Sequence, residues 1–408
     1  MKWRHERTRT MGEATGSREV YPRLREYLDR LPAGYPETES GVEIRLLEKI
    51  FTPEEAEVFT HCKLVAEPPS AIGERCGMPE PEAREMLERM AKKGHVFEVP
   101  SGDKTLYMAL PWMPGIIETQ LNLMDEEFAR MLLEHSRDYF PTWTALENQM
   151  FRVIPVDSAI ETTPAVETYD RIRDLVKKQK QISVMPCLCR ETQGTLDNDC
   201  GRPHETCFVF GPYSRHFVEN GDGRYIGVEE ALSILDACEK NALVLQPVNA
   251  RELNGMCCCC SCCCFMLDNL RKLPNPAAVV QSSYQAKIDP GLCNLCGTCL
   301  ERCQMDAATE VEGSMTVNLA RCIGCGLCLS ECPEDAISLF PKGGTRHVPT
   351  NVFDTLTRIA GERDLPFGKF NFFVKHTSSP TFFRSLSLLN RIGLARPVVK
   401  QLEKRGLV

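Results

Sequence analysis

The feature of this sequence that most constrains its fold is a cysteine motif that occurs twice towards the C-terminus. Each copy has the spacing C-x2-C-x2-C-x3-C, and the copies are offset by 29 residues. They comprise Cys293, Cys296, Cys299 and Cys303, and then Cys322, Cys325, Cys328 and Cys332. Such spacing places three thiolates around one cubane and directs the fourth towards a second one. The repeat therefore predicts a small domain that folds around two [4Fe-4S] clusters.

The same spacing predicts how the eight cysteines are shared between the two clusters. One cluster would be bound by Cys293, Cys296, Cys299 and Cys332, and the other by Cys322, Cys325, Cys328 and Cys303. Zinc knuckles are the alternative, because C-x2-C pairs also bind zinc, but a doubled four-cysteine run favours iron and sulfide. Gln304 replaces the proline that usually follows such a motif, whereas Pro333 is present in the second copy. We expect this departure to affect loop rigidity more than ligation.

Cysteine is abundant, with 22 residues in a chain of 408, and 20 of them lie between Cys187 and Cys332. A chain of this length can bury a sizeable core without disulfides. The N-terminal segment lacks the apolar stretch of a secretory signal, and no apolar run approaches the ~18–20 residues of a membrane span. We therefore expect a soluble, cytoplasmic protein whose cysteines serve metal or redox chemistry. Cys62, Cys76 and Cys238 fit buried core positions.

A second group of cysteines lies in the middle of the chain, at Cys187, Cys189, Cys200 and Cys207. Four thiolates are enough to hold a third [4Fe-4S] cluster, and the Arg190 cation would offset its negative charge. Two alternatives remain open: a zinc site that uses three of these cysteines with His204, and simple buried thiols. We take the four cysteines as candidate metal ligands.

The run from Cys257 to Cys264 contains seven cysteines in eight positions. Neighbouring side chains diverge in both helices and strands, so only a subset can face one metal. The run could complete or cover the cluster at Cys187 to Cys207, which we favour. It could instead carry a further cluster or a copper or zinc thiolate site, or contain redox-active pairs.

The pattern of apolar and polar residues predicts a multidomain α+β protein. A helix start at Thr52, further helices over 70–76 and 80–93, and a hairpin over 95–108 follow the order of a winged helix. The predicted parts are a flexible arm (1–40), a winged-helix-like domain (41–115), a helical linker with a cysteine-rich mixed α/β middle domain (116–280), a two-[4Fe-4S] ferredoxin-like domain (281–341) and a basic aromatic tail (342–408).

Charge is distributed unevenly along the chain. Residues 341–408 carry 12 Lys and Arg against 4 Asp and Glu, whereas residues 1–340 carry 36 against 52. Residues 52–110 hold 11 acidic against 7 basic residues, which argues against nucleic-acid binding by the winged-helix-like domain. The tail, rich in phenylalanine, suits docking on the acidic body or on a partner, with peripheral contact to an anionic membrane as the alternative.

Four segments together resemble a family of cytoplasmic 4Fe-4S ferredoxin-type proteins from anaerobic bacteria and archaea. They are the T-x-E-E-A start at Thr52–Ala56, the C-x-C-R segment at Cys187–Arg190, a cluster similar to I-C-N-C-C-x-C-C-C, and the two ferredoxin motifs. Met256 and Cys258 stand where the family has Ile and Asn. The resemblance covers about residues 40–340, and it implies electron transfer as a subunit or partner of a larger oxidoreductase.

We therefore expect an iron-sulfur electron-transfer protein with two ferredoxin-type clusters and a further cluster in the middle domain. No catalytic residue is predicted, because transfer of single electrons needs neither a general acid nor a nucleophile. Two alternatives are an iron-sulfur redox-sensing DNA-binding regulator, and an oxidoreductase whose middle cluster has an open iron position. The sequence implies that a redox partner exists, but it identifies neither that partner nor a substrate.

Overall fold

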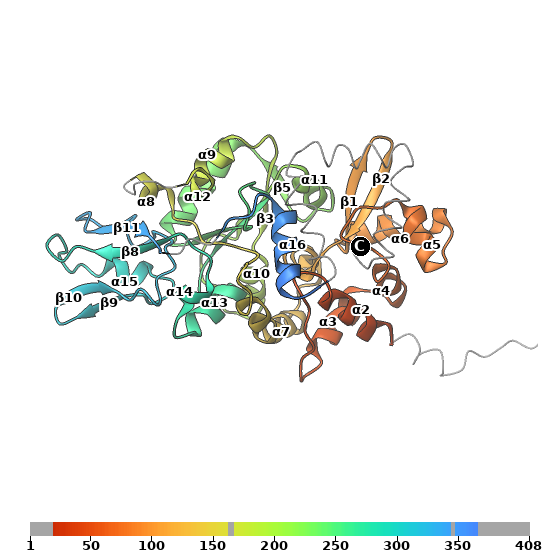
Figure 1. Cartoon of the computed structure of the whole chain (residues 1–408), viewed down its shortest axis with the longest axis horizontal. Coiled ribbons are helices and arrows are strands. Elements are labelled where there is room, and N and C mark those ends of the chain that lie inside the picture. The colour runs from red at the N-terminus through yellow and green to blue at the C-terminus, as the bar shows by residue number, and fades with distance from the viewer. Residues whose placement is uncertain (1–18, 162–166, 344–346, 366–408) are drawn as a thin grey trace, which may run out of the picture. The chain divides into compact units, whose positions relative to one another are not determined.

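The computed structural model describes residues 19–161, 167–343 and 347–365 (Figure 1). The chain divides into two compact units, one that ends at His135 and one that begins at Ser136. Both contain helices and strands, which confirms the α+β class. The predicted ferredoxin-like domain falls within the second unit, as does the predicted linker and middle domain from Ser136 onwards, whereas its first residues, 116–135, belong to the first unit. No helix in the described ranges is long and apolar enough to cross a membrane.

The first unit consists of helices followed by a hairpin. The helices are α2 (Val20–Asp29), α3 (Val42–Ile50), α4 (Pro53–Phe59), α5 (Pro69–Cys76) and α6 (Glu80–Lys92). Strands β1 (Val96–Ser101) and β2 (Lys104–Ala109) pair antiparallel. Three short turns, η1 (Trp112–Ile116), η2 (Ile117–Thr119) and η3 (Leu121–Leu123), precede α7 (Glu126–Thr144), which crosses the division between the units.

Local signals explain where these helices begin and end. At α4, Thr52 and Glu55 form a reciprocal capping box that satisfies free backbone N–H groups. Gly77 ends α5 in the left-handed conformation that glycine adopts at little cost. These positions confirm the helices and the hairpin predicted over 52–108. Helix α2, however, buries Leu24 and Leu28, so the flexible arm predicted over residues 1–40 is corrected from Val20 onwards.

The centre of the second unit is a five-stranded antiparallel sheet with strand order β5-β3-β4-β7-β6. Its strands are β3 (Ile182–Pro186), β4 (Glu205–Phe210), β5 (Arg224–Ile226), β6 (Val244–Pro247) and β7 (Gly255–Cys259). The remaining elements here are α8 (Asp157–Glu161), η4 (Thr168–Asp170), α9 (Ile172–Lys177), α10 (Leu188–Thr195), α11 (Pro212–Glu219), α12 (Val228–Lys240), α13 (Phe265–Lys272) and α14 (Pro276–Val279).

Two antiparallel strand pairs and a short helix flank the repeated cysteine motif. Strand β8 (Tyr284–Ile288) pairs with β11 (Ile337–Pro341), and β9 (Ala308–Val311) pairs with β10 (Ser314–Val317). Helix α15 (Thr298–Arg302) lies between them in sequence and next to β9 in space (Figure 1). Buried apolar residues of these strand pairs and of the five-stranded sheet belong to one continuous core. The two predicted domains therefore fold against each other.

The first part of the predicted tail is folded onto the same unit. Helix α16 (Val352–Glu362) begins at Asn351, whose side chain accepts a hydrogen bond from the Asp354 N–H. The Thr355 hydroxyl donates to the Asn249 carbonyl, and the Arg251 N–H donates to the carbonyl of Pro349. Of the phenylalanines of the predicted aromatic tail, Phe353 lies in α16. The others lie outside the described residues; they are Phe367, Phe370, Phe372, Phe373, Phe382 and Phe383.

Candidate metal centres

The first cluster site is a cavity at the start of the first cysteine motif. Four of its lining residues are the predicted ligands Cys293, Cys296, Cys299 and Cys332. The cavity is also lined by Cys328, by apolar side chains such as Ile288 and Met315, and by a few polar ones such as Asn294. Cys332 comes from the second motif, so the two motifs interleave at this site. Five cysteines line this cavity, and the four predicted ligands among them are a donor set that suits a [4Fe-4S] cluster.

The second site gathers the other four predicted ligands. Burial and then the neighbouring charges of Cys303 and Cys322 raise the pKa of Cys325 to about 12. Two backbone amides point at sulfur: the Ala286 N–H lies 3.3 Å from Cys322 Sγ, and the Ala307 N–H lies 3.1 Å from Cys303 Sγ. Hydrogen bonds of this kind stabilise thiolates and tune the potential of a bound cluster. This set also suits a [4Fe-4S] cluster.

The loop between the first two cysteines of each motif bends through the left-handed region. Leu295 has φ of 62° in the first copy, and Gly324 has φ of 70° at the equivalent position of the second. A Cβ atom on Gly324 would lie 2.0 Å from the Tyr284 carbonyl oxygen, so only glycine fits there. In the first copy this position is open, and Leu295 is 44% exposed. The two loops thus make the same backbone bend, but only the loop of the second motif is closely packed at this position.

The second motif is packed against the rest of the unit, and the first is open to solvent. The Val156 N–H donates to the Cys325 carbonyl at 3.0 Å, and a Cβ atom on Gly326 would meet Ala159. In the first motif, Cys296 is exposed and Leu292 is 55% exposed. The two cluster sites therefore differ in their access to solvent.

Gln304, the visible departure from the motif, has a specific contact. Its side chain is buried, and its Oε1 accepts hydrogen bonds from the Ser261 N–H at 2.8 Å and from the Ser261 hydroxyl at 3.1 Å. Ser261 lies within the cysteine run of the middle domain. A proline at position 304 could not accept these hydrogen bonds. Glutamine at this position therefore connects the ferredoxin motif with the cysteine run of the middle domain.

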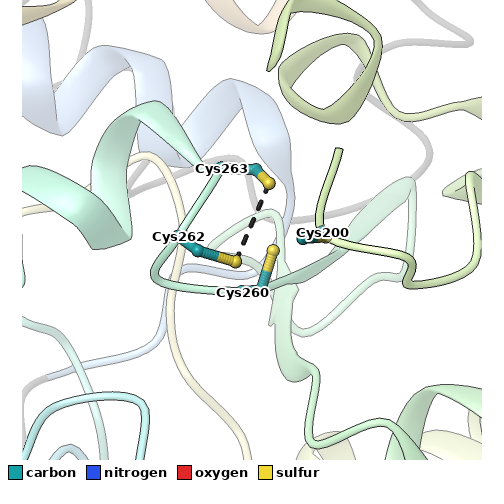
Figure 2. Close-up of side chains that lie close together, drawn as sticks. All are labelled: Cys200, Cys260, Cys262 and Cys263. Carbon is teal, nitrogen blue, oxygen red and sulfur yellow. Dashed lines mark hydrogen bonds between the residues drawn. The ribbon is translucent and has the colours of Figure 1, made fainter. Parts of the chain in front are cut away.

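The segment that carries Ser261 also contributes to a compact group of four thiols. The Sγ atoms of Cys200, Cys260, Cys262 and Cys263 all lie within 4.8 Å of one another. Figure 2 shows three of them on the turn between β7 and α13, with Cys200 on a separate segment beside them. The Cys262 and Cys263 sulfurs are 3.7 Å apart. Four thiols at this spacing are a candidate metal site.

Two arginines supply positive charge to this site. The Arg202 Nη1 donates to Cys262 Sγ at 3.1 Å. Arg190 is fully buried and donates to the carbonyls of Pro203 and Cys258 and to the Thr206 hydroxyl. A hydrogen bond from Cys263, followed by the charge of Arg190, lowers the pKa of Cys260 to about 5 against the effect of burial. At least one thiolate is thus favoured beside the two cations.

The structure separates Cys200 from the other three predicted middle ligands. Cys200 belongs to the compact site, whereas the Cys189 thiol interacts with those of Cys187 and Cys264. Cys207 faces Cys257 across the β4–β7 ladder. The cysteines of the 257–264 run are therefore divided between these two groups of thiols. Sequence spacing could not show this division, because the partner cysteines come from distant segments of the chain.

His204, considered as a zinc ligand, has other partners. Its Nδ1 lies 2.6 Å from Glu191 Oε1, and its Nε2 lies 3.4 Å from Asp199 Oδ1. Hydrogen bonding to Glu191 raises the pKa of the imidazole. Both ring nitrogens are engaged by carboxylates and not by the thiol groups.

The remaining thiols are in the core or close to it. Cys62 and Cys238 are buried, as expected for core positions, whereas Cys76 is partly exposed at the end of α5. The Cys238 thiol interacts with that of Cys258, a buried member of the run. The hydrogen bond with Cys238, and then burial, raise the pKa of Cys258 well above its ordinary value. Cys62, Cys238 and Cys258 are therefore core side chains.

Comparison with known proteins identifies one segment. Residues 292–337 match the family model of the 4Fe-4S dicluster domain, a match that spans both cysteine motifs. No curated protein and no solved structure matches the chain. The match and the cysteine-rich group in the middle of the chain support an iron-sulfur protein with a ferredoxin-like segment.

Proposed function

We propose that the protein transfers single electrons through two [4Fe-4S] clusters, as a cytoplasmic subunit or partner of a larger oxidoreductase. The observation that carries this proposal is the pair of interleaved cysteine sets within a segment that matches a dicluster domain. When bound, such clusters accept and release one electron at a potential set by their surroundings. The protein's own contribution is to hold the thiolates, to donate N–H···S hydrogen bonds and to control solvent access.

The unequal exposure of the two motifs supports a direction for the transfer. The first motif presents the exposed Leu292, Leu295 and Leu300 around Cys296, which suits contact with a redox partner. Residues 284–340 carry 8 acidic against 3 basic residues, so a basic docking face would be complementary. The second motif faces the middle domain. Electrons would be exchanged with the partner at the first motif and with the middle domain at the second.

A third cluster in the middle domain remains part of the proposal. Cys187 and Cys189 stay as its ligands, and the thiols of Cys264 and Cys259 are connected with them through direct thiol interactions. Cys207 lies opposite Cys257 at the edge of this group. Cys200 is the one predicted ligand that we assign elsewhere. The buried Arg190 would offset the charge of thiolates in this group.

We propose that the first unit and the tail serve protein contacts. The order of α4, α5, α6, β1 and β2 is that of a winged helix, and the excess of acidic residues over 52–110 favours a protein partner over DNA. The basic residues beyond Leu365 would bind an acidic surface. Co-sedimentation with anionic vesicles tests this proposal, which predicts no binding to them. If the tail instead contacts a membrane, the full chain should co-sediment in a salt-sensitive way, and a chain truncated after Leu365 should not.

The test is the iron and sulfide content of anaerobically purified protein, together with the EPR spectrum of its reduced form. About eight irons and eight sulfides are expected from the ferredoxin motifs, and about twelve of each if the third cluster is present. Cys296→Ser and Cys325→Ser should each remove or alter one cluster signal, with Cys76→Ser as the unaffected control. Protein that cannot be loaded beyond one cluster would overturn the proposal.

A further inference from the structure

The spacing of the compact thiol site decides what kind of centre it can hold. A zinc–sulfur bond of about 2.3 Å gives tetrahedral sulfur–sulfur distances of about 3.8 Å around one ion. In a cubane each outer sulfur is bonded to a different iron, so these sulfurs lie roughly 6 Å apart. The four sulfurs here lie within 4.8 Å, and the Cys262 and Cys263 sulfurs are separated by 3.7 Å. These distances fit one ion.

The ferredoxin motifs provide an internal comparison. All eight of their cysteines are described, yet no three of their sulfurs come within 4.8 Å of one another. In the part of the chain that the structure describes, only Cys200, Cys260, Cys262 and Cys263 do so. The molecule therefore holds two kinds of thiol group, and the compact kind is separate from the sites that match a cluster-binding family.

Two cationic side chains lie beside the compact site. Arg190 is 1% exposed, and within the described residues no carboxylate forms an ion pair with it. Its hydrogen-bond acceptors are neutral, and its Nε has no partner. A buried cation is costly without a counter-charge, and the sulfurs of Cys187 and Cys260 are among the groups that can supply it. Arg202 adds a second cation at Cys262. Four thiolates on one divalent ion carry a net negative charge, which Arg202 would offset together with Arg190, whose charge the neighbouring Cys187 group shares.

The placement of the ligands fits a structural role. Cys200 lies in the segment between α10 and β4, while the other three lie on the turn between β7 and α13. An ion bound by all four would fasten these distant segments together and leave no position open for substrate. The same turn carries Ser261, which binds Gln304 beside the ferredoxin ligand Cys303.

We propose that Cys200, Cys260, Cys262 and Cys263 bind a single tetrahedral ion, zinc or iron, without inorganic sulfide. This centre is additional to the electron-transfer clusters and does not depend on their function. Its ligand set is all cysteine, a closed arrangement typical of structural sites. It would hold the middle-domain turn in the position from which it contacts the ferredoxin motif.

The first test uses the unmodified protein, purified without oxygen. Cubanes contain iron and sulfide in equal numbers, so a single-ion site leaves about one metal ion per chain in excess of sulfide. Elemental analysis identifies that ion as zinc or iron. Equal amounts of total metal and sulfide would overturn the proposal, whatever the number of clusters.

The second test uses Cys262→Ser, because Cys262 is the exposed ligand and its substitution leaves the core intact. We expect the loss of about one metal ion with no loss of sulfide, and unchanged EPR signals from the ferredoxin clusters. Cys76→Ser, a partly exposed thiol in the other unit, is the matched control and should lose nothing. Loss of about four irons with four sulfides, or of no metal, would overturn the proposal.

Discussion

The two copies of the cysteine motif share one spacing but have different neighbours. In the first copy, Cys296 is exposed and the left-handed position of the loop is occupied by an exposed leucine, Leu295. In the second copy, the equivalent position is the buried Gly324, which lies against the backbone of Tyr284. A motif that holds a cluster thus fixes the bend of its loop, while the surrounding fold decides which residues can make that bend.

This difference separates the requirements of ligation from those of packing. Both copies need the same backbone path around their cysteines. Only the second must also fit against Tyr284 and Ala159, because it faces the rest of its unit. Substitutions at equivalent positions should therefore have unequal effects, and the size of the inequality measures how much the packing contributes.

The largest effect is expected from Gly324→Ala. Its Cβ atom would lie 2.0 Å from a backbone oxygen, which cannot move without disturbing the β8–β11 pairing. The loop should shift, and the second site should lose its cluster, about four irons and four sulfides per chain. Leu295→Ala at the equivalent open position is the control and should retain full iron content. Equal losses in both variants would show that packing does not distinguish the copies.

The next largest effect is expected on stability, when two glycines that each follow a motif cysteine, Gly326 and Gly297, are replaced by alanine. Both have positive φ, so alanine should cost about 1 kcal/mol at either position. At Gly326 the new Cβ would also come within 2.5 Å of the Ala159 Cβ, which brings the total to about 2–4 kcal/mol. Nothing lies near the new atom at Gly297. Denaturant unfolding, followed through the cluster absorbance, should show this difference, and similar midpoints would contradict it.

The residue after the last cysteine of each motif gives the third comparison. Gln304→Leu removes the acceptor of two hydrogen bonds from Ser261 and leaves a buried N–H without a partner, at a cost of about 1–3 kcal/mol. Pro333 is exposed in the second copy, so Pro333→Ala should change stability by less than about 0.5 kcal/mol. The measurement is the thermal midpoint of the anaerobic protein. A Gln304→Leu protein as stable as the wild type would show that this contact does not join the two regions.

Sequence reasoning succeeds in the ferredoxin motifs because most of their ligands are local. Three cysteines of each set lie within seven residues of one another, so spacing alone constrains their geometry. It also identified Gln304 as unusual, but its partner Ser261 is 43 residues away and no local pattern points to it. The helices and hairpin over 52–108 could be predicted for the same reason, since caps and turns are local signals.

The middle domain shows where that reasoning stops. Cys200 joins Cys260 and its neighbours only because the segment after α10 returns to the end of β7, which is a property of the sheet topology. The prediction that only a subset of the 257–264 run faces one centre was sound. The choice of partners depends on tertiary structure, which spacing does not contain.

The smallest effect is expected at Leu295 itself. A leucine in the left-handed region carries a backbone cost of roughly 1–2 kcal/mol, which glycine would relieve. Part of this gain would be lost, because glycine has a greater conformational entropy in the unfolded state. Leu295→Gly should therefore stabilise the protein by at most about 1 kcal/mol, with unchanged iron content. The same substitution removes an exposed apolar side chain beside Cys296, so electron exchange with a docking partner should slow while stability rises. Unchanged exchange rates would mean that the partner does not use this face of the first motif.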